Sequence, residues 1–333
     1  MSSQEATGQS ANRAMMRAIS QDVFGGPQVL HLIQAPRPEP LPTEVLVRVV
    51  AAGVNPVDDK TRAGGGMAGV VGEPPLILGW DVSGMVEQVG FGVHTLAVGD
   101  HVYGMPWFPR RAGGYAEYVT APSRQFARKP ATVTHEQAAA VPLAALTAWQ
   151  VLVDAAAVQP GQRVLVHAAA GGVGHFAVQI AKHLGAYVIG TARQSKHAWL
   201  DQLGVDEVID YTTTRFEQVA KDVDVVVDLV GDGHDRTSQR SLDVLTPGGL
   251  IIAVPSGVSP DLGAAAAERG LRAQSFLVEP DGHALARLAE LIDTGALRIE
   301  VAEVLPLARA SEAHQRLATG RTQGKIVLRV AGR

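Results

Sequence analysis

The segment 163–196 of the chain reads as a strand, a glycine-rich turn, an amphipathic helix and a second strand. The apolar run 164–166 is typical of a strand buried in a parallel sheet. Glycines follow at once, and the apolar residues Phe176, Ile180 and Leu184 then recur with helical spacing. Backbone amides at such a turn, with the positive end of the following helix behind them, cradle the pyrophosphate of a dinucleotide. The segment therefore predicts a Rossmann-type cofactor site.

The turn departs from the common G-x-G-x-x-G pattern, because Ala169 stands in the first position, before Gly171 and Gly174. The alternative interpretation is a tight turn without a ligand. The order of strand, turn and helix favours the phosphate-binding interpretation. We expect the cofactor to contact the residues of the turn: Ala170, Gly171, Gly172, Val173 and Gly174.

The second strand, expected at 187–191, decides which dinucleotide is bound. Enzymes that prefer NAD place an acidic residue about 20 residues after the turn, where it binds the ribose hydroxyls and would repel a 2′-phosphate. Ala192 holds that position here, and two cations and a hydroxyl suited to a phosphate monoester follow: Arg193, Ser195 and Lys196. Lys182 on the intervening helix is a further candidate for the phosphate. We therefore predict NADPH as the cofactor; a solvated surface turn is the alternative.

The chain contains no cysteine, which excludes disulfides, cysteine nucleophiles and cysteine-ligated zinc. This composition is compatible with a cytoplasmic location. A formal net charge of −4 with scattered signs argues against nucleic acid as a partner. No apolar run reaches the length needed to cross a membrane. Residues 1–14 are polar and lack the apolar core of a signal peptide, so we expect a disordered tail.

The length of 333 residues suits about two domains. Residues 15–138 contain short apolar runs separated by Gly, Pro and Asp, which predicts a strand-rich domain. Helix and strand patterns alternate over 139–275, which predicts an α/β doubly wound parallel sheet. The remaining segment, 276–333, is too short to fold alone. We expect it to complete the N-terminal domain, so that the dinucleotide-binding domain is inserted within another domain, with a cleft between them.

Individual elements follow from the same patterns. Strands are expected in the N-terminal part at 45–50, 82–89 and 115–120, and in the inserted part at 164–168, 187–191, 207–209, 223–229 and 250–254. The C-terminal segment should contain helices at 283–294 and 308–318 and strands at 303–306 and 325–330.

Several motifs occur in the order found in one known family: GVNPVDDKTRAG, LGWDVSGMVEQVG, VGDHVYG, GGYAEYV, PLAALTAWQ, HAAAGGVGHFAVQIAKHLGA, VDVVVDLVG, LTPGGLIIAV and GKIVL. The chain resembles the zinc-free quinone oxidoreductase branch of the medium-chain dehydrogenases/reductases, which includes zeta-crystallin. The resemblance covers about residues 15–330. It implies a GroES-like β-rich catalytic domain with an inserted Rossmann domain, and commonly a homodimer or homotetramer formed partly through the Rossmann sheets.

Zinc-dependent alcohol dehydrogenases of the same superfamily are the nearest rival interpretation. Their catalytic metal uses cysteine and histidine ligands, with a Gly-His-Glu segment near the position of Gly79, Trp80 and Asp81 in this chain. Those ligands are absent here, so we expect no metal. The remaining histidines of the glycine-rich region are expected to be structural or exposed: His167, His175 and His183.

The resemblance implies hydride transfer from NADPH to a small molecule, either a quinone or an α,β-unsaturated carbonyl compound such as an enone. The protein must position this acceptor and stabilise the anion that develops on it. By similarity, Asn55 lies beside the nicotinamide and donates its amide to a carbonyl oxygen, whereas Asp58 more often holds structure. Lys60 stands where related reductases often carry a tyrosine. It either stabilises an enolate or is a surface residue without a role, and both interpretations stay open.

Further contacts are carried over from the matching motifs. The expected cofactor contacts outside the turn are Thr147, Val230, Gly231, Pro255, Ser256, Gly324 and Lys325. Trp107 and Phe108 are expected to form an aromatic lid over a planar substrate or a contact between subunits. Two alternative functions remain open. One is an enoyl reductase of polyketide or other secondary metabolism, and the other is a non-catalytic NADPH-binding protein with a crystallin-like or RNA-binding role.

Overall fold

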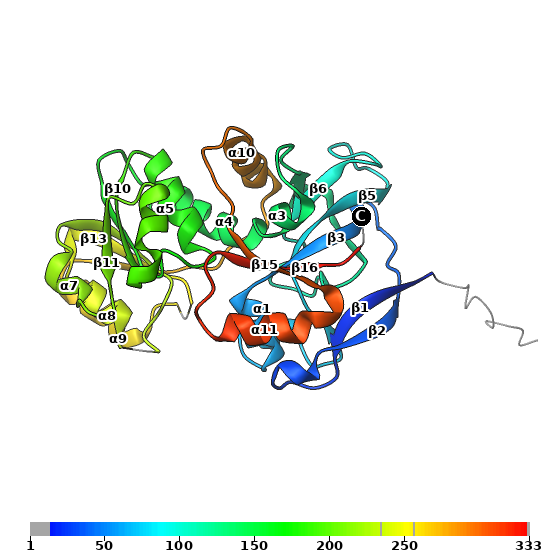
Figure 1. Cartoon of the computed structure of the whole chain (residues 1–333), viewed down its shortest axis with the longest axis horizontal. Helices are drawn as coiled ribbons and strands as arrows, with labels where there is room; N and C mark the ends of the chain where they lie inside the picture. Colours follow the sequence, from blue (N-terminus) through cyan, green and yellow to red (C-terminus); the bar gives the residue numbers. More distant parts are fainter. Residues whose placement is uncertain (1–13, 234, 256, 332–333) are drawn as a thin grey trace, which may run out of the picture.

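The computed structural model describes residues 14–233, 235–255 and 257–331. A seven-stranded sheet, a six-stranded parallel sheet and a small three-stranded sheet hold its strands. Figure 1 shows the six-stranded sheet at one end of the molecule and the seven-stranded sheet at the other, with α4 (Pro142–Trp149) and α10 (Gly282–Asp293) between them. This arrangement confirms the expected combination of a GroES-like part and a Rossmann-like part.

The seven-stranded sheet has the order β15-β16-β3-β5-β6-β8, and β7 pairs with β3 off this path. Its strands are β3 (Glu44–Val54), β5 (Asp81–Val89), β6 (His101–Gly104), β7 (Tyr118–Pro122), β8 (Phe126–Arg128), β15 (Val301–Pro306) and β16 (Lys325–Arg329). The small sheet has the order β2-β1-β4 and consists of β1 (Met15–Gln21), β2 (His31–Pro36) and β4 (Leu76–Ile77). β16 lies antiparallel to β3, so β15 and β16 from the C-terminal segment join the sheet formed by β3 to β8 of the N-terminal part.

The six-stranded sheet has the order β11-β10-β9-β12-β13-β14, with every pair parallel, as in a Rossmann fold. Its strands are β9 (Arg163–Val166), β10 (Tyr187–Ala192), β11 (Glu207–Asp210), β12 (Val223–Asp228), β13 (Leu245–Ala253) and β14 (Arg272–Ser275). The expectation lacked β14, because its sequence RAQS is polar and mostly exposed and gives no apolar run. The predicted domain limits near residues 138 and 275 remain a prediction.

The helices between these strands are short. Those of the parallel sheet are α5 (Gly174–His183), α6 (His197–Gln202), α7 (Phe216–Val219), α8 (Thr237–Ser241) and α9 (Pro260–Glu268). The other helices are α1 (Pro56–Arg62), α2 (Ala68–Val71), α3 (His135–Ala139) and α11 (Ala310–Ala318), and α1 packs against α11 (Figure 1). Among the described residues, no helix combines the length and the apolar character that a membrane span requires.

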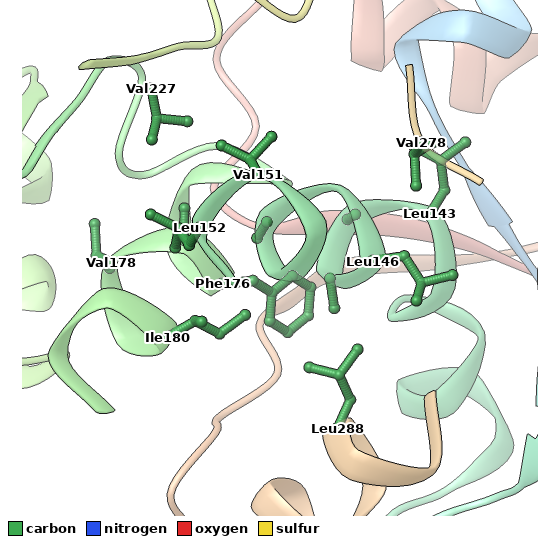
Figure 2. Packing of buried hydrophobic residues seen from close by; sticks show 14 of the residues in the cluster. Leu143, Leu146, Val151, Leu152, Phe176, Val178, Ile180, Val227, Val278 and Leu288 are labelled. Carbon is green, nitrogen blue, oxygen red and sulfur yellow. The ribbon is translucent and has the colours of Figure 1, made fainter. Parts of the chain in front are cut away.

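One hydrophobic core runs from the parallel sheet into the N-terminal part of the molecule. Phe176 of α5 is fully buried and lies beside Leu146 of α4 and Leu288 of α10 (Figure 2). The same cluster reaches Trp80 at the start of β5. Because this core is continuous, it fixes the parallel sheet relative to the strands that carry the expected catalytic residues.

Candidate functional site

The glycine-rich turn connects β9 to α5 and needs glycine for steric reasons. The amide of Gly171 donates to the carbonyl oxygen of Ala168 at 2.8 Å and closes the turn. A Cβ atom on Gly174 would lie 2.2 Å from that same carbonyl oxygen, which no side chain tolerates. Ala169 is fully buried, and its Cβ lies 2.9 Å from the position that a Cβ on Gly190 would take. The alanine in the first motif position therefore fills space beside the glycine of the neighbouring strand.

Two amides of the turn have no acceptor within the described part of the chain. The N–H groups of Gly172 and Val173 make no backbone or side-chain hydrogen bond, and both residues are partly exposed. They directly precede the first turn of α5, in which the amides of His175, Phe176 and Ala177 donate to carbonyl oxygens of the turn. Unpaired donors at the start of a helix suit a pyrophosphate, so Ala170 to Gly174 fit the dinucleotide expected from the sequence.

The expected phosphate-binding residues lie together just beyond the carboxyl end of β10. Arg193 is exposed and donates from Nε to the hydroxyl of Tyr211 at 2.9 Å. Lys196 is partly buried and donates from Nζ to Oε1 of Gln323 at 3.1 Å, while Ser195 is exposed. Both cations bond to neutral groups, so their charge is available to an anionic ligand.

Tyr211 is a candidate that the sequence analysis missed. It directly follows β11, which pairs with β10, and its side chain is half exposed beside Arg193. Because the carboxyl ends of parallel strands lie at the same edge of a sheet, the residue after β11 lies close to the residue after β10. A phenol hydroxyl at this place can donate to a phosphate oxygen.

The structure does not bring Lys182 together with the other residues expected to bind the phosphate. Its ammonium lies 2.7 Å from Oδ2 of Asp206 and donates to the carbonyl oxygen of Ala186 at 3.1 Å. α5 runs antiparallel to the strands, so Lys182 lies at the amino edge of the parallel sheet, whereas Arg193 and Lys196 lie beyond its carboxyl edge. The two edges are separated by the length of β10. A lysine side chain is too short to span that distance.

A second group of polar residues forms where β3, β5 and β16 meet. In the strand register, Gly53 pairs with both Asp81 and Val327, and Val54 pairs with Ile326. Asn55 follows Val54, and Lys325 precedes Ile326. The register therefore brings both residues next to Asp81, at one edge of the seven-stranded sheet. We refer to these three residues as the buried triad.

Hydrogen bonds join the three side chains of the buried triad. Nδ2 of Asn55 donates to Oδ2 of Asp81 at 2.9 Å, and Nζ of Lys325 donates to Oδ1 of Asn55. Nζ of Lys325 also donates to the carbonyl oxygen of Val54 at 3.1 Å and lies 3.7 Å from Oδ2 of Asp81. The other carboxylate oxygen of Asp81 accepts the amide of Leu143 at the start of α4 at 2.7 Å. This pattern connects the sheet to the helix that separates it from the Rossmann part.

Asn55 is only 1% exposed, and its amide oxygen and one of its N–H groups are already engaged. The second N–H group of Nδ2 makes no hydrogen bond within the described residues, so donation of the Asn55 amide to a substrate carbonyl stays a prediction. In the structure, Asn55 joins the carboxylate of Asp81 to the ammonium of Lys325.

Lys325 also contacts the glycine-rich turn. Its Cδ lies 3.0 Å from the position that a Cβ on Gly172 would take, and the amide of its neighbour Gly324 donates to the carbonyl oxygen of Ala170 at 3.1 Å. Gly324 has a φ of +68° and no room for a side chain against Glu300. Gly324 and Lys325, which the sequence predicts as cofactor contacts, thus lie next to the turn that fits the pyrophosphate.

Burial controls the ionisation of the triad. It raises the pKa of Asp81 above the usual value, although the ammonium of Lys325 opposes this effect. Burial likewise lowers the pKa of Lys325, and Asp81 and Asp58 oppose it. Asp58 is fully buried and accepts hydrogen bonds from the hydroxyl of Tyr115 at 2.8 Å and from the amide of Asn55 at 2.7 Å. Desolvation raises the pKa of Asp58 to about 7.

The remaining expected cofactor contacts have mixed surroundings. Thr147 is buried on α4 and donates to the carbonyl oxygen of Leu143 at 2.7 Å. The amides of Val230 and Gly231, just after β12, both donate to Oδ1 of Asp228 at 2.9 Å, so both amides are already engaged. Pro255 follows β13 and is partly exposed, and Ser256 lies outside the described residues. A role for each in cofactor binding stays a prediction.

Trp107 and Phe108 both pack within the N-terminal part, and their expected role as an aromatic lid or as a contact between subunits stays a prediction. Phe108 is 5% exposed and packs edge-on against Trp80, with ring centroids 5.3 Å apart. Trp107 is partly buried and donates from Nε1 to the carbonyl oxygen of Thr120 at 2.7 Å. Both rings are therefore fixed inside the N-terminal part by apolar packing, which the sequence of the loop did not indicate. Lys60 lies exposed on α1, whereas the neighbouring Asp58 points inward.

The histidines of the glycine-rich region are structural or exposed. His167 is buried between the hydroxyl groups of Thr191 and Ser241, and burial lowers its pKa to about 4. His175 is buried and bonds the carbonyl oxygen of Gly171 at 3.0 Å, whereas His183 is exposed. Within the ranges that the structure describes, no three His, Asp or Glu side chains are grouped so as to hold a metal ion.

Comparisons with known proteins match this arrangement. Residues 41–131 match a family model described as alcohol dehydrogenase GroES-like domain, and residues 203–328 match one described as zinc-binding dehydrogenase. An Arabidopsis thaliana protein named NADPH-dependent alkenal/one oxidoreductase, chloroplastic, is 33% identical over 94% of this chain and 79% of its own length.

Two solved structures are similar over nearly the whole chain. The quinone oxidoreductase of Coxiella burnetii is 38% identical, with a TM-score of 0.90 over 96% of this chain and 100% of that one. The Escherichia coli quinone oxidoreductase, solved in complex with NADPH, is 30% identical, with a TM-score of 0.84 over 94% of this chain and 100% of that one.

Proposed function

Because the chain belongs to the zinc-free, quinone oxidoreductase-type branch of the medium-chain dehydrogenase/reductase family, we propose that it transfers hydride from NADPH to a quinone or an α,β-unsaturated carbonyl. One observation carries the proposal. The turn with unpaired amides lies between two polar regions, the cations Arg193 and Lys196 at one end and the buried triad at the other. A dinucleotide phosphate fits the first region and a developing anion suits the second.

The residues have distinct tasks in this proposal. The amides of Gly172 and Val173 bind the pyrophosphate, and Arg193, Lys196 and Tyr211 bind the 2′-phosphate. The cofactor, when bound, supplies a hydride at the nicotinamide ring. The protein then has to orient the acceptor and to stabilise the negative charge that remains on it.

The buried triad serves the last task. Lys325 carries a positive charge at the turn, and Asn55 and Asp81 hold its ammonium in one position. A charge fixed in this way in a desolvated site stabilises a developing enolate or hydroquinone anion without reorganisation during the reaction. Whether Lys60 adds to this effect stays a prediction, and a Lys60→Ala variant with kcat reduced less than about threefold would remove it from the mechanism.

The decisive experiment measures NADPH oxidation with a panel of acceptors. We expect turnover with 9,10-phenanthrenequinone, with 1,4-benzoquinone or with short enones, and product analysis would separate reduction of the ring from reduction of the C=C bond. A preference for NADH over NADPH, or turnover that depends on added zinc, would contradict the proposal.

A matched pair of glycine variants provides the control. Gly174→Ala places a Cβ 2.2 Å from the carbonyl oxygen of Ala168, so we expect it to abolish NADPH binding and turnover. Gly69→Ala adds the same methyl group where no atom lies within 4 Å and where φ is ordinary, so it should retain both. Loss of activity in both variants would show that the assay reports stability rather than cofactor binding.

Two alternative functions give different outcomes in the same assay. An enoyl reductase of secondary metabolism would reduce enoyl thioesters in preference to quinones and simple enones. A non-catalytic binding protein would bind NADPH and oxidise it with none of the acceptors.

We also propose a homodimer, with a tetramer as the alternative, in a cytoplasmic location. β14 is the edge strand of the parallel sheet and is largely exposed, which supports pairing through this edge. The location rests on composition alone, and the Arabidopsis thaliana relative is named chloroplastic. Light scattering would test the assembly, and fractionation of the source cell would test the location.

A further inference from the structure

Buried polar atoms that make no hydrogen bond are concentrated in one place. In the described part of the chain, every such side-chain atom belongs to one of the following residues: Gln21, Asp58, Asp59, Arg62 and His314. The atoms of the last three residues are held by ion-pair contacts alone, since Oδ1 of Asp59 lies 3.0 Å from the guanidinium of Arg62 and 3.5 Å from Nδ1 of His314. Three elements supply these residues, namely β1, α1 and α11, and α1 packs against α11 (Figure 1). Buried polar groups in native proteins are nearly always hydrogen-bonded, so this cluster requires an explanation.

The same cluster contains a continuous path of groups that can carry a proton. Oδ1 of Asp59 lies 3.5 Å from Nδ1 of His314, and Nε2 of His314 lies 3.3 Å from the hydroxyl of Tyr115. That hydroxyl donates to Oδ2 of Asp58 at 2.8 Å. A carboxylate and an imidazole each exist in two protonation states. A phenol hydroxyl can donate its proton to one neighbour and accept a proton from another.

The path leads from the surface to the interior. The side chain of Asp59 is 24% exposed, whereas His314, Tyr115 and Asp58 are fully buried. Asp59 also pairs with the guanidinium of Arg62 at 3.0 Å, which keeps its carboxylate in place at the outer end. Solvent therefore reaches the first member of the path, and each later member is reached through the one before it.

The inner end of the path lies beside the buried triad. Asp58 accepts the backbone amide of Asn55 at 2.7 Å. Among the charged and titratable groups of the packed elements, Tyr115, Asp81 on β5 and Lys325 on β16 act on Asp58 itself. Asp59 and Arg62 on α1 and His314 on α11 act on one another and form the outer part of the path. Two buried carboxylates, Asp58 and Asp81, thus share one buried ammonium. The charge of this group changes by one unit when Asp58 takes up a proton.

We infer that Asp59, His314 and Tyr115 form a proton path that lets Asp58 take up a proton from water while negative charge develops on the acceptor. This inference rests on the proposed function. Hydride transfer moves two electrons and one hydrogen from NADPH to the acceptor and leaves NADP⁺ and an anion. The anion takes one proton from solvent to become the product, and Asp58 returns its own proton to water through the same path. Asp58 and His314 are thus positioning residues that act through the charge beside Lys325.

The first test uses no substrate, so it is independent of the proposed function. The holoprotein is jumped from pH 9 to pH 6, and the infrared band of a buried protonated carboxyl group is followed in time. The band that is missing in Asp58→Asn is assigned to Asp58. Burial raises the pKa of Asp58 to about 7, so its carboxyl group takes up a proton in this jump. We expect His314→Gln, which keeps a hydrogen-bonding side chain but does not titrate, to slow the appearance of this band at least about tenfold.

Matched variants control this test. His135→Gln changes a partly buried histidine of the same part of the molecule, bonded to Ser83 at 2.8 Å and outside the path, and should leave the rate within about twofold. If His314→Gln does not fold, Tyr115→Phe keeps the ring but removes the hydroxyl, and it should slow proton uptake in the same way. Equal rates in the wild type and in the path variants would overturn the inference.

The second test uses turnover. In the wild type, kcat should fall as the pH rises above about 7, where Asp58 loses its proton. Asp58→Asn should make kcat independent of pH over this range, and His314→Gln should enlarge the solvent isotope effect on kcat while leaving KM for NADPH unchanged. A pH profile unchanged by Asp58→Asn would contradict the role in charge compensation. If the wild type reduces no acceptor, the proposed function fails, and the infrared test alone still decides whether the path exists.

Discussion

The two ends of the candidate cofactor site hold their charges in opposite ways. At the phosphate end, Arg193 is exposed and Lys196 is partly buried, and each bonds to a neutral side chain. The opposite end, formed by the buried triad and expected to hold the nicotinamide, is the nicotinamide end. Its residues Asn55, Asp81 and Lys325 are at most 3% exposed and bond to one another. Charges at the first end are screened by water, whereas charges at the second are desolvated and depend on their partners.

This difference predicts different consequences of substitution. A residue at the phosphate end can be changed with little effect on folding, because water replaces its contacts. A residue at the nicotinamide end belongs to the core of the fold, because its loss leaves another buried charge unpaired. We therefore expect substitutions at the first end to alter affinity and those at the second to alter stability.

The largest effect is expected for Lys325→Met. The change removes the only ammonium of the buried triad and leaves Asp81 and Asp58 buried without a cation. We expect the free energy of unfolding in urea to fall by about 3–5 kcal/mol at pH 8. Lys196→Met, which removes a cation bonded to the neutral Gln323, should cost less than about 0.5 kcal/mol. An equal loss of stability in the two variants would break the comparison.

The next effect concerns cofactor choice. Arg193→Ala combined with Lys196→Ala removes both cations that suit the 2′-phosphate, so KM for NADPH should rise roughly a hundredfold while KM for NADH stays unchanged. Steady-state kinetics with both cofactors measures the difference. Lys182→Ala, whose ammonium pairs with Asp206 at the opposite edge, serves as the control and should change neither value. A parallel rise for NADH would disprove a phosphate-specific role.

A smaller effect depends on pH. Burial raises the pKa of Asp58 from 3.8 to about 7, so between these values the folded state binds a proton that the unfolded state releases. This contribution to stability is complete below pH 4 and is lost as the pH rises to 7. Asp58→Asn cannot titrate, so its stability relative to the wild type should increase by roughly 2 kcal/mol between pH 5 and pH 8. Urea unfolding at both pH values tests this, and a constant difference would show that Asp58 is ionised throughout.

The smallest effect tests backbone strain at the turn. Ala168 has a φ of +49°, a conformation that costs an alanine about 1–2 kcal/mol. Ala168→Gly removes this strain and adds chain entropy to the unfolded state, so the net gain in stability should be about 0.5 kcal/mol. Ala156→Gly, at a φ of −85°, should instead lose about 0.5–1 kcal/mol. A loss in both variants would indicate that the turn is not strained.

The two ends also differ in how far the sequence predicts them. The phosphate end is predicted from the single segment 163–196, in which strand, turn and helix follow one another. The structure places Arg193 and Lys196 together just after β10, as that segment leads one to expect. Tyr211 was missed because it lies on the adjacent strand, and only the parallel pairing of β10 with β11 brings it near. The structure separates Lys182 from these residues, because α5 runs antiparallel to the strands and ends at the opposite edge of the sheet.

The nicotinamide end depends on contacts between distant parts of the chain. Asn55 and Lys325 are 270 positions apart and meet only through the antiparallel register of β3 with β16. The motif resemblance named both residues but not their contact, and it placed the amide of Asn55 on the substrate. Asp81 was noted only for the absence of a zinc ligand, and His314 was not noted at all, since neither residue has a local pattern that predicts burial beside a charge.

The place of β16 in the sequence has a consequence for synthesis. β16 is the final strand, ends at Arg329 and supplies the ammonium that Asn55 and Asp81 hold. During translation the N-terminal strands and the whole parallel sheet leave the ribosome before β16 does. The growing chain therefore carries the carboxylates of Asp58 and Asp81 without their cation until β16 has emerged. A chain that ends before Lys325 would contain every strand of the parallel sheet but would lack the ammonium of the buried triad.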